Sequence, residues 1–450
     1  MNKPSEKKDA DGLPVPEKTP SLRQGGGKNA APAGRQKTTG LERSWILYDV
    51  GNSAFTLLVS TLFPIYFNAL ADAEGISSVD YLAYWGYATS IVTAIVALLG
   101  PILGSLTDTK GFKKPVFVSS MAIGVLACVA LGFTGSWLVF LIVFVVAKIG
   151  YAASLVFYDS MIHDVTTPER MDDISSKGYA WGYIGSCVPF IISLVLVLFS
   201  DRIGLDQMRA MTIAFIINAL WWLGCTVPLL RRYRQRHFVA RPQRVVRESF
   251  ARLGHALRSL KKDRQVLLFL LAFFCYIDGV YTIIDMATAY GTALGLDSTG
   301  LLLALLLTQL VAFPFALLFG YLSRRFSSAR LIPICIAAYT GIAVYAFFLD
   351  SQTKFWILAV CVGMFQGGIQ ALSRSHFAKI IPAEKSGEYF GLYDICGKGA
   401  SFFGTMLISV ASQLTGSVNI GVASLAILFV AGLALFLKSC GGKEVPASAR

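Results

Sequence analysis

The stretch TGLLLALLLTQLVAFPFALLFGYL, residues 299–322, contains no charged residue from end to end, and residues 81–106 form a second run of the same kind. An apolar run of about 18 or more residues is long enough to cross the ~30 Å hydrocarbon layer of a bilayer. The whole chain of 450 residues has this character, because 55% of it is hydrophobic and only 15% is charged. Soluble proteins average about 45–50% apolar and about 25% charged residues. The composition therefore excludes a soluble enzyme, a disordered protein and a fibrous one.

Apolar blocks of this length recur along the chain after residue 44, with charged residues between them. We expect twelve membrane-spanning helices, near 45–70, 81–106, 115–134, 137–162, 178–199, 210–230, 266–292, 299–322, 331–349, 354–377, 389–412 and 419–437. They predict an all-α integral membrane protein with an N-terminal six-helix bundle (45–230) and a C-terminal six-helix bundle (266–437). Residues 1–44 lack the apolar stretch of a signal peptide and predict a disordered cytosolic tail, and 438–450 predict a second, short tail.

The basic residues predict the orientation of these spans. The formal net charge is +13, and most Lys and Arg lie in residues 1–44 and 231–264. An even number of spans puts both termini on one side of the membrane. The positive-inside rule makes that side the cytoplasmic side of a cell membrane. We interpret this charge as orienting the chain and contacting lipid, and we expect no nucleic acid as a partner. The linker 231–265 contains an amphipathic stretch, 246–260, that we expect to lie along the inner membrane surface as a helix.

Three weak matches, in the same order in both halves, indicate an internal duplication. YDVG at 48–51 matches YIDG at 276–279, and GSLT at 104–107 matches GYLS at 320–323. Proline also stands after the fourth and the tenth expected span, at Pro168 and Pro382. We therefore expect the two bundles to be related by pseudo-symmetry.

The loop after the second span reads GSLTDTKGFKK, residues 104–114. It resembles the G-x(3)-D-x(2)-G-x-[RK]-[RK] loop of the major facilitator superfamily, with Phe112 where that family usually has Arg. Glycine permits a tight turn and a close helix approach, and the carboxylate of Asp108 can sit at a helix end and pair with a basic group of the neighbouring bundle. We expect a cytosolic latch between the two bundles, which breaks during transport. A polar turn with orienting lysines is the alternative interpretation. The residues of the expected latch are Gly104, Asp108, Gly111, Lys113 and Lys114.

Five charged residues inside the expected spans are candidates for function, because a charge at a helix centre costs ~2.5–3.5 kcal/mol on the insertion scale. Asp278 lies close to the midplane of the seventh span and Lys148 is similarly deep in the fourth. Asp285 follows Asp278 by seven residues and is expected to face nearly the same way. Asp394 and Lys398 can pair as i, i+4 neighbours. We expect Asp278 to carry a proton that couples transport; the alternative for these charges is a set of structural ion pairs.

Further strings carry a more specific resemblance. YDVGNSAF at 48–55 resembles the YDxxNSAF opening of the vacuole-effluxer branch of the major facilitator superfamily, the family related to the autophagy-associated amino-acid exporter of yeast. The strings FYD at 157–159, SSKGYAWGYIG at 175–185, QALSRS at 370–375 and YFGLYDICGKG at 389–399 are similar to later segments of that family. The resemblance covers the chain from Leu41 to about Leu437. It implies twelve-helix alternating access and the efflux of amino acids or related small solutes.

Polar residues on the first and tenth spans are the candidates for binding that solute, because these spans line the central cavity in this superfamily. Asp49 and Asn52 lie on the first span, while Gln366 and Gln370 share one face of the tenth. Amides that both donate and accept hydrogen bonds suit a zwitterionic or polar substrate. Hydrogen bonding between helices is the alternative role for each of them.

We therefore expect a secondary transporter, and no enzyme, that acts as a monomer. Its expected partners are a small-molecule substrate and H⁺ as the coupling ion. The four histidines lie at or beyond the expected helix ends, and no HExxH, GxSxG or nucleotide-binding loop occurs in the sequence. Seven of the eight cysteines fall inside apolar runs, so we expect no cofactor, no metal, no disulfide and no catalytic residue. A Na⁺-coupled importer and a non-transporting membrane sensor or scaffold with the same fold are the alternatives.

Overall fold

The computed structural model describes residues 37–76, 78–240 and 263–440, and these residues form helices apart from connecting loops and one isolated β-bridge. The first half contains α1 (Gly40–Ser60), α2 (Leu62–Ala73), α3 (Ser78–Thr107), α4 (Lys113–Leu131), α5 (Trp137–Ser160), α6 (Ile162–Val165), α7 (Met171–Leu198) and α8 (Gln207–Arg232). The second half contains α10 (Arg264–Ala293), α11 (Ser298–Leu322), α12 (Ser328–Ala346), α13 (Gln352–Ile380), α14 (Ser386–Thr415), α15 (Val418–Ala423) and α16 (Ala426–Cys440). Short 3₁₀ turns, η1 (Pro168–Arg170), η2 (Asp201–Ile203) and η3 (Ala383–Lys385), lie in the loops.

Every expected span corresponds to a helix or a pair of helices. Within the described ranges, 11 helical segments are long and apolar enough to cross a membrane. The remaining expected span, 389–412, is covered by the 30-residue helix α14. Its apolar segment Phe403–Thr415 is shorter than those 11 segments. The all-α membrane fold is therefore confirmed. The amphipathic stretch 246–260 and most of both tails lie outside the described residues.

The first span is broken, which the hydropathy pattern did not predict. Helices α1 and α2 meet at Thr61, whose backbone angles (φ −133°, ψ −79°) are not helical. Pro64 explains the break, because it has no N–H to donate to the carbonyl of Ser60, and its ring clashes with that carbonyl. At its start, α1 begins at Gly40, where Thr39 and Glu42 form a capping box. The helix thus starts four residues before the expected end of the N-terminal tail.

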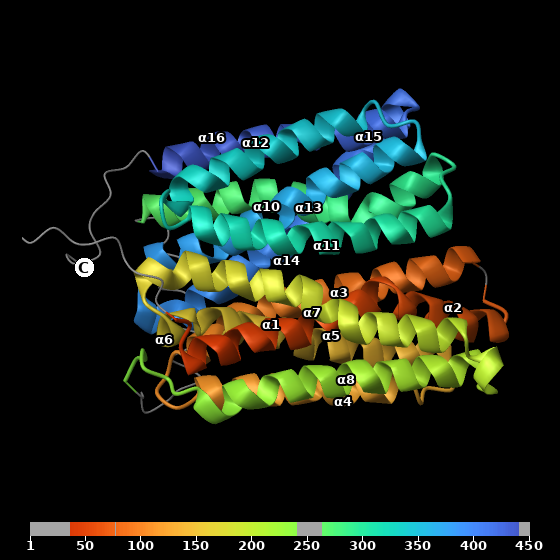
Figure 1. Cartoon of the computed structure of the whole chain (residues 1–450), viewed down its shortest axis with the longest axis horizontal. Helices are drawn as coiled ribbons and strands as arrows, with labels where there is room; N and C mark the ends of the chain where they lie inside the picture. Colours follow the sequence, from red (N-terminus) through yellow and green to blue (C-terminus); the bar gives the residue numbers. More distant parts are fainter. Residues whose placement is uncertain (1–36, 77, 241–262, 441–450) are drawn as a thin grey trace, which may run out of the picture. The chain divides into compact units, whose positions relative to one another are not determined.

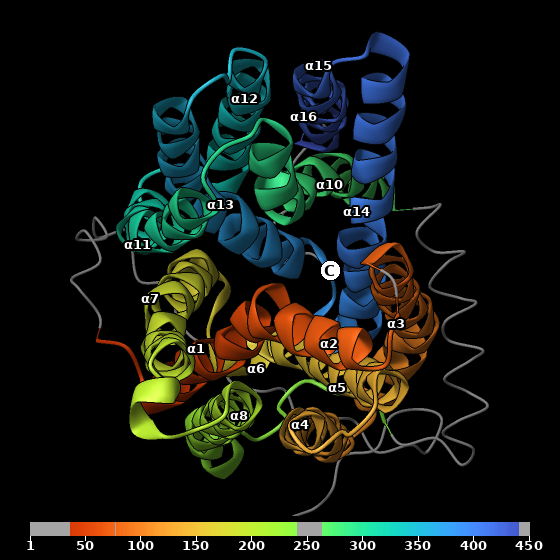
Figure 2. The ribbon, with the colours of Figure 1, turned by 90° about the vertical axis from the view of Figure 1, so that its right-hand side faces the viewer.

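The helices form two bundles that correspond to the two halves of the sequence (Figures 1 and 2). Helices α1 to α8 lie together, and helices α10 to α16 lie together on the other side. Between the bundles, α3 packs against α14, and α7 packs against α11 and α13. We call the end of the bundles at which α1 begins and α16 ends the terminal end; it carries the loops 108–112, 161–170, 323–327 and 381–385. The opposite end is called the far end.

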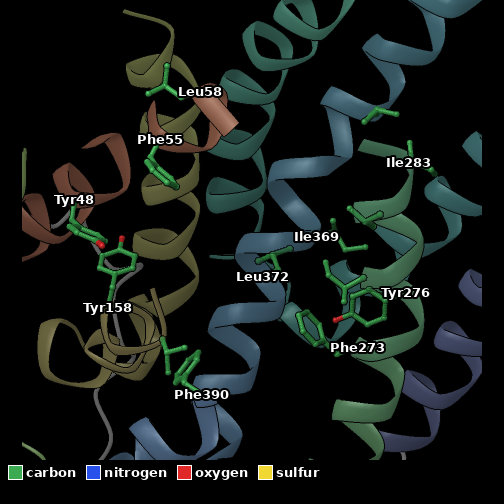
Figure 3. Packing of buried hydrophobic residues seen from close by; sticks show 14 of the residues in the cluster. Tyr48, Phe55, Leu58, Tyr158, Phe273, Tyr276, Ile283, Ile369, Leu372 and Phe390 are labelled. Atoms are coloured by element: carbon green, nitrogen blue, oxygen red, sulfur yellow. The ribbon is translucent and has the colours of Figure 1, made fainter. Parts of the chain in front are cut away.

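Matching contacts in the two bundles support the duplication. The hydroxyl of Tyr48 on α1 lies 2.7 Å from Ser154 Oγ on α5, and the hydroxyl of Tyr276 on α10 lies 2.7 Å from Ser373 Oγ on α13. In each bundle, the first helix is thereby fixed to the fourth by a tyrosine–serine hydrogen bond. Figure 3 shows Tyr48 beside Tyr158 in the first bundle and Tyr276 beside Phe273 in the second.

The loops repeat as well. Pro168 opens the turn η1 that leads into α7, and Pro382 precedes the turn η3 that leads into α14. Gly104 at the end of α3 packs against Gly387 of α14, and Gly320 at the end of α11 packs against Ser176 of α7. The second helix of each bundle therefore contacts the fifth helix of the other bundle at the terminal end.

Candidate functional site

The centre of the site is Arg374, a buried guanidinium on α13 that sequence reasoning did not select. Its Nη1 donates to Asp159 Oδ1 on α5 at 3.0 Å, and its Nη2 lies 3.3 Å from Asp49 Oδ2 on α1. On α7, Ser175 accepts from Arg374 Nε through its Oγ at 2.9 Å and from Nη2 through its carbonyl at 3.1 Å. The side chain of Arg374 is only 2% exposed. One cation of the second bundle is thus bound by three helices of the first.

Aromatic rings complete the surroundings of this guanidinium. Its central carbon lies 4.6 Å from the ring centroid of Trp45, 4.4 Å from that of Tyr179 and 5.6 Å from that of Tyr158. These distances are within the range of cation–π attraction, which is strongest where water is excluded. Two carboxylates and three aromatic faces therefore hold Arg374 from α1, α5 and α7.

A glycine allows α1 and α7 to approach each other at this point. A Cβ atom on Gly178 would collide with Asp49 Oδ2, and it would lie 3.0 Å from Arg374 Nη2. Alanine here would therefore displace one of the two charged partners. Gly178, part of the string 175–185, therefore lies against the charged network itself.

The polar residues expected on the first and tenth spans are connected indirectly, through Arg374 and through α7. Asn52 is buried and donates to Asp49 Oδ1 at 3.3 Å and to the carbonyl of Tyr48 at 3.1 Å. Gln370 is buried one turn before Arg374 on α13, and its Oε1 accepts from the hydroxyl of Tyr183 on α7 at 2.9 Å. Helix α7 links the two spans, a role that the sequence did not indicate.

Gln366 lies one further turn along α13 on the same face as Gln370. Its Oε1 is buried and has no hydrogen-bond partner in the described structure. A buried amide oxygen without a partner is costly. Gln366 Oε1 is therefore a buried acceptor close to Tyr183 of α7 that makes no direct hydrogen bond in the described structure.

A second group of charges lies on α5, α10 and α14, and its members interact across the two bundles. Lys148 on α5 lies close enough to Asp285 of α10 for the two charges to attract each other. Asp285 is exposed, while Lys148 and Asp394 are half-buried. Asp394 acts electrostatically on Tyr151 of α5 and Tyr281 of α10. The expected pairing of Asp394 with Lys398 stays a prediction, because the Lys398 side chain lies outside the described part.

The structure separates Asp278 from these groups. Asp278 is fully buried between α10 and α14, where its Oδ1 accepts from the backbone N–H of Gly404 at 3.0 Å and lies 3.3 Å from Thr282 Oγ1. Its Oδ2 is buried and has no hydrogen-bond partner in the described structure. Asp278 and Asp285 differ in burial, since Asp278 is enclosed within the second bundle and Asp285, about two turns further along α10, is exposed; that they face nearly the same way stays a prediction.

The loop 104–114 connects the two bundles through Asp108. This carboxylate is buried at the start of α14, where Oδ1 accepts from Gly387 N at 2.7 Å and Oδ2 accepts from Glu388 N at 2.9 Å. The first N–H groups of a helix have no partner within the helix, so an anion at this position is favourable. Burial raises the pKa of Asp108 to about 6, although Lys113 and the two N–H groups act in the opposite direction.

The other residues of the expected latch have different roles. Lys113 is buried, lies 3.6 Å from Asp108 Oδ1 and donates to Ser386 Oγ of α14 at 2.8 Å. Gly111 has a left-handed φ of 83°, which glycine adopts at no steric cost, and its N–H donates to the linker residue Gln235. Lys114 is exposed. The basic partner of Asp108 thus comes from its own loop and not, as the sequence suggested, from the neighbouring bundle.

More cross-bundle contacts surround the start of α7 at the terminal end. Lys379 of α13 pairs with Asp172 at 2.5 Å, and Arg324 of the loop after α11 pairs with Asp173 at 2.9 Å. Buried His163 donates from Nε2 to the carbonyl of Ala378 at 2.7 Å, and burial lowers the pKa of this imidazole to about 4. His163 was expected beyond a helix end, where an exposed position is usual.

The missed residues had a signal in the sequence. Arg374 falls inside the expected span 354–377 and Asp159 inside 137–162, so the argument that a charge within a span is costly applies to both. Tyr183 carries no charge, and its bond with Gln370 joins residues 187 positions apart, which hydropathy cannot reveal.

No group of three or more His, Cys, Asp or Glu side chains that could hold a metal ion occurs in the described ranges. All eight cysteines are free thiols.

Comparisons with known proteins show the family and the fold of this chain. Residues 38–440 match the family model described as "Vacuole effluxer Atg22 like". The MFS-type transporter YxiO of Bacillus subtilis (strain 168) is 42% identical over 405 residues, which are 89% of this chain and 95% of the relative. Autophagy-related protein 22 of Eremothecium gossypii is 25% identical over 87% of this chain and 89% of its own length. The crystal structure of the major facilitator superfamily transporter FucP in the outward conformation has a TM-score of 0.69 at 13% identity, covering 89% of this chain and 97% of that one.

Proposed function

Because the chain belongs to the Atg22-like vacuole effluxer family of major facilitator superfamily transporters, we propose that it exports small polar solutes, amino acids above all, by alternating access coupled to protons. In this mechanism the two bundles rock about a central site, so that the site opens to one side of the membrane at a time. The chain described here is closed at the terminal end.

The observation that carries the proposal is the set of polar bonds between the bundles at that end. Arg374 joins α13 to Asp49 and Asp159, and Asp108 accepts from the first N–H groups of α14. The ion pair of Lys379 on α13 with Asp172 on α7 is a further bond between the bundles at this end. Removing one partner of a buried ion pair costs about 3–5 kcal/mol when the remaining charge stays dry. These bonds can break at a lower cost when water enters as the bundles part, so they suit a gate that is closed in one state and hydrated in the other.

We place the terminal end on the cytoplasmic side of a cell membrane. Lys110, Lys113 and Lys114 in one loop and Arg324 and Arg325 in another lie at this end. By contrast, the far end carries Arg202, Arg209 and Lys354. The positive-inside rule then gives two cytoplasmic termini and a gate that is closed towards the cytoplasm.

Asp278 is the group that we propose for proton coupling. Burying a carboxylate without a counter-ion is costly, whereas the protonated acid is neutral. The unpartnered Oδ2 and the contact with Gly404 of α14 mean that the charge state of Asp278 acts on the packing of α10 against α14. Since α14 also carries the N–H groups that bind Asp108, protonation within the second bundle is connected through one helix to the gate.

Flux in proteoliposomes tests this function. We expect a panel of amino acids to include a solute whose export is driven by a pH gradient. Asp278→Asn should abolish the pH-driven component and retain exchange of solute between the two sides, while the exposed Asp350→Asn serves as the matched control. Unchanged pH dependence in Asp278→Asn would exclude the coupling role. Flux driven by a Na⁺ gradient would contradict proton coupling, and no flux of any solute would favour a sensor or scaffold.

A further inference from the structure

The surroundings of Arg374 are one-sided. Arg374 belongs to the second bundle, and each of its contacts described above belongs to the first. We call these six residues the socket: Trp45, Asp49, Tyr158, Asp159, Ser175 and Tyr179. Their carboxylates provide two negative charges against the single positive charge of Arg374. The socket therefore binds a guanidinium that comes from outside its own bundle, much as a receptor binds a ligand.

The socket is held together without Arg374. Trp45 Nε1 donates to the carbonyl of Tyr158 at 3.1 Å, and the Tyr158 hydroxyl donates to the carbonyl of Trp45 at 3.1 Å. Their rings are stacked, with centroids 4.4 Å apart and planes inclined by 16°. Asn52 fixes Asp49 from the same helix. These contacts all lie within the first bundle, so separation of the bundles leaves the binding geometry in place.

Separation does remove the cation. When the terminal end opens, Arg374 moves away with α13, and two carboxylates and the faces of three aromatic rings remain. Carboxylates that accept N–H groups, beside aromatic faces, are the groups that bind guanidinium and ammonium ions in proteins. Guanidinium fits best, because its planar fork of donors and its weak hydration match the position that Arg374 itself occupies.

We propose that the vacated socket is a binding site for an organic cation of the substrate, with guanidinium-bearing amino acids preferred, and that Arg374 competes with that cation for the site. The proposal rests on the alternating-access function above and gives it a substrate class. Closure of the terminal end then returns Arg374 to the socket and displaces the substrate towards the far end. Substrate release is thereby coupled to closure on the side from which the substrate entered.

Thermal stability of the purified full-length protein tests the competition, with methylguanidinium as the probe and NaCl at equal ionic strength as the reference. Arg374→Ala empties the socket permanently. If the socket is free in a tenth of the wild-type molecules or fewer, we expect half-maximal stabilisation of Arg374→Ala at a concentration at least about tenfold lower than for the wild type. Adding Asp159→Asn to Arg374→Ala should remove this gain.

Arg325→Ala is the matched control, because it removes an exposed arginine at the same end whose ring contact, Tyr321, lies within its own bundle. Equal responses of Arg374→Ala and Arg325→Ala to methylguanidinium would overturn the proposal. If Arg374→Ala does not fold, binding of radiolabelled arginine to the wild type and to Asp159→Asn decides instead. A clear loss of binding in Asp159→Asn supports the socket, and equal binding, or none to either protein, overturns it.

Transport by the wild type separates this proposal from the proposed function. Leucine flux together with no effect of guanidinium on Arg374→Ala would leave the exporter intact and refute the cation socket. Tighter cation binding by Arg374→Ala together with no flux of any solute would keep the socket and refute the exporter.

Discussion

Gly104→Ala is the substitution for which the structure makes the sharpest prediction about the gate. A Cβ atom at this position would overlap the carbonyl oxygen of Gly387 on α14 and lie 2.7 Å from its carbonyl carbon. Real Cβ contacts are essentially never shorter than 3.0 Å, and the obstacle is backbone, which cannot rotate away. Overpacking of this kind costs about 1–3 kcal/mol. The added methyl group therefore destabilises the closed terminal end relative to the open one.

The expected magnitude follows from that cost. A penalty of about 1–3 kcal/mol on one of two states changes their ratio by roughly 5- to 150-fold. Amide hydrogen exchange of the full-length protein in detergent or nanodiscs measures this ratio, because the N–H groups of Gly387 and Glu388 are bound to Asp108 in the structure described here and we expect opening to release them. We expect their exchange to accelerate by the same factor.

Gly100→Ala provides the matched control on the same helix. Its Cβ atom would lie 3.6 Å from the carbonyl oxygen of Gly391, an ordinary van der Waals contact. Both substitutions replace glycine by alanine within α3, so the gain in helix propensity, about 1 kcal/mol, is common to the two variants and cancels in their comparison. If both variants exchange at the same rate, the close approach of α3 to α14 does not determine closure and the reasoning is wrong.

Three further predictions concern the latch, pH and the duplicated core. Asp108→Ala should accelerate exchange at the start of α14 by roughly 30- to 150-fold, equivalent to about 2–3 kcal/mol, since it removes the acceptor of two N–H groups, and Lys114→Ala should not. Burial lowers the pKa of His163 from 6.5 to about 4, so between these pH values only the unfolded chain binds a proton at this residue. The melting temperature should therefore fall as the pH decreases from about 6.5 to 4. The fall should be smaller in His163→Gln. Tyr48→Phe and Tyr276→Phe should each lower the unfolding free energy by about 0.5–1.5 kcal/mol in chemical denaturation, and a loss in only one would contradict equivalent roles.

The prediction for His163 depends on the sign of its shift. Its Nε2 donates to a carbonyl and its Nδ1 is buried without a partner in the described structure, so the neutral ring is the form that fits. Asp108 lies at the same end and its raised pKa acts in the opposite direction, because protonation there favours the closed state as the pH falls. The difference between wild type and His163→Gln isolates the imidazole from this carboxylate.

Hydropathy alone determined the number and position of the membrane helices. A run such as 299–322 has no alternative to crossing a bilayer, since its length and lack of charge depend on no distant residue. The same holds for the loop 104–114, whose glycines and aspartate indicated a turn at a helix end before any partner was known. The break at Thr61 was missed, although Pro64 was the local signal for it.

Among the site residues, the sequence identified those whose chemistry is unusual for their surroundings. Asp49, Gln370 and Asp278 are polar groups in apolar segments, and the structure buries all three. Their partners were not readable in the same way. The pairing of Asp49 with Arg374 joins positions 325 residues apart. The burial of Asp278 inside the second bundle depends on how α10 packs against α14.

What the sequence determined, then, is the set of helices, the halves into which they divide and the list of costly polar groups. Each follows from local composition, because transfer of a segment into lipid depends on that segment alone. What only the tertiary structure decided is which of these groups face each other across the bundles, and hence that Arg374 is held entirely by α1, α5 and α7. The physical reason is that a buried charge must find its partner in space, and the packing of helices, not the order of residues, determines which carboxylate is within reach.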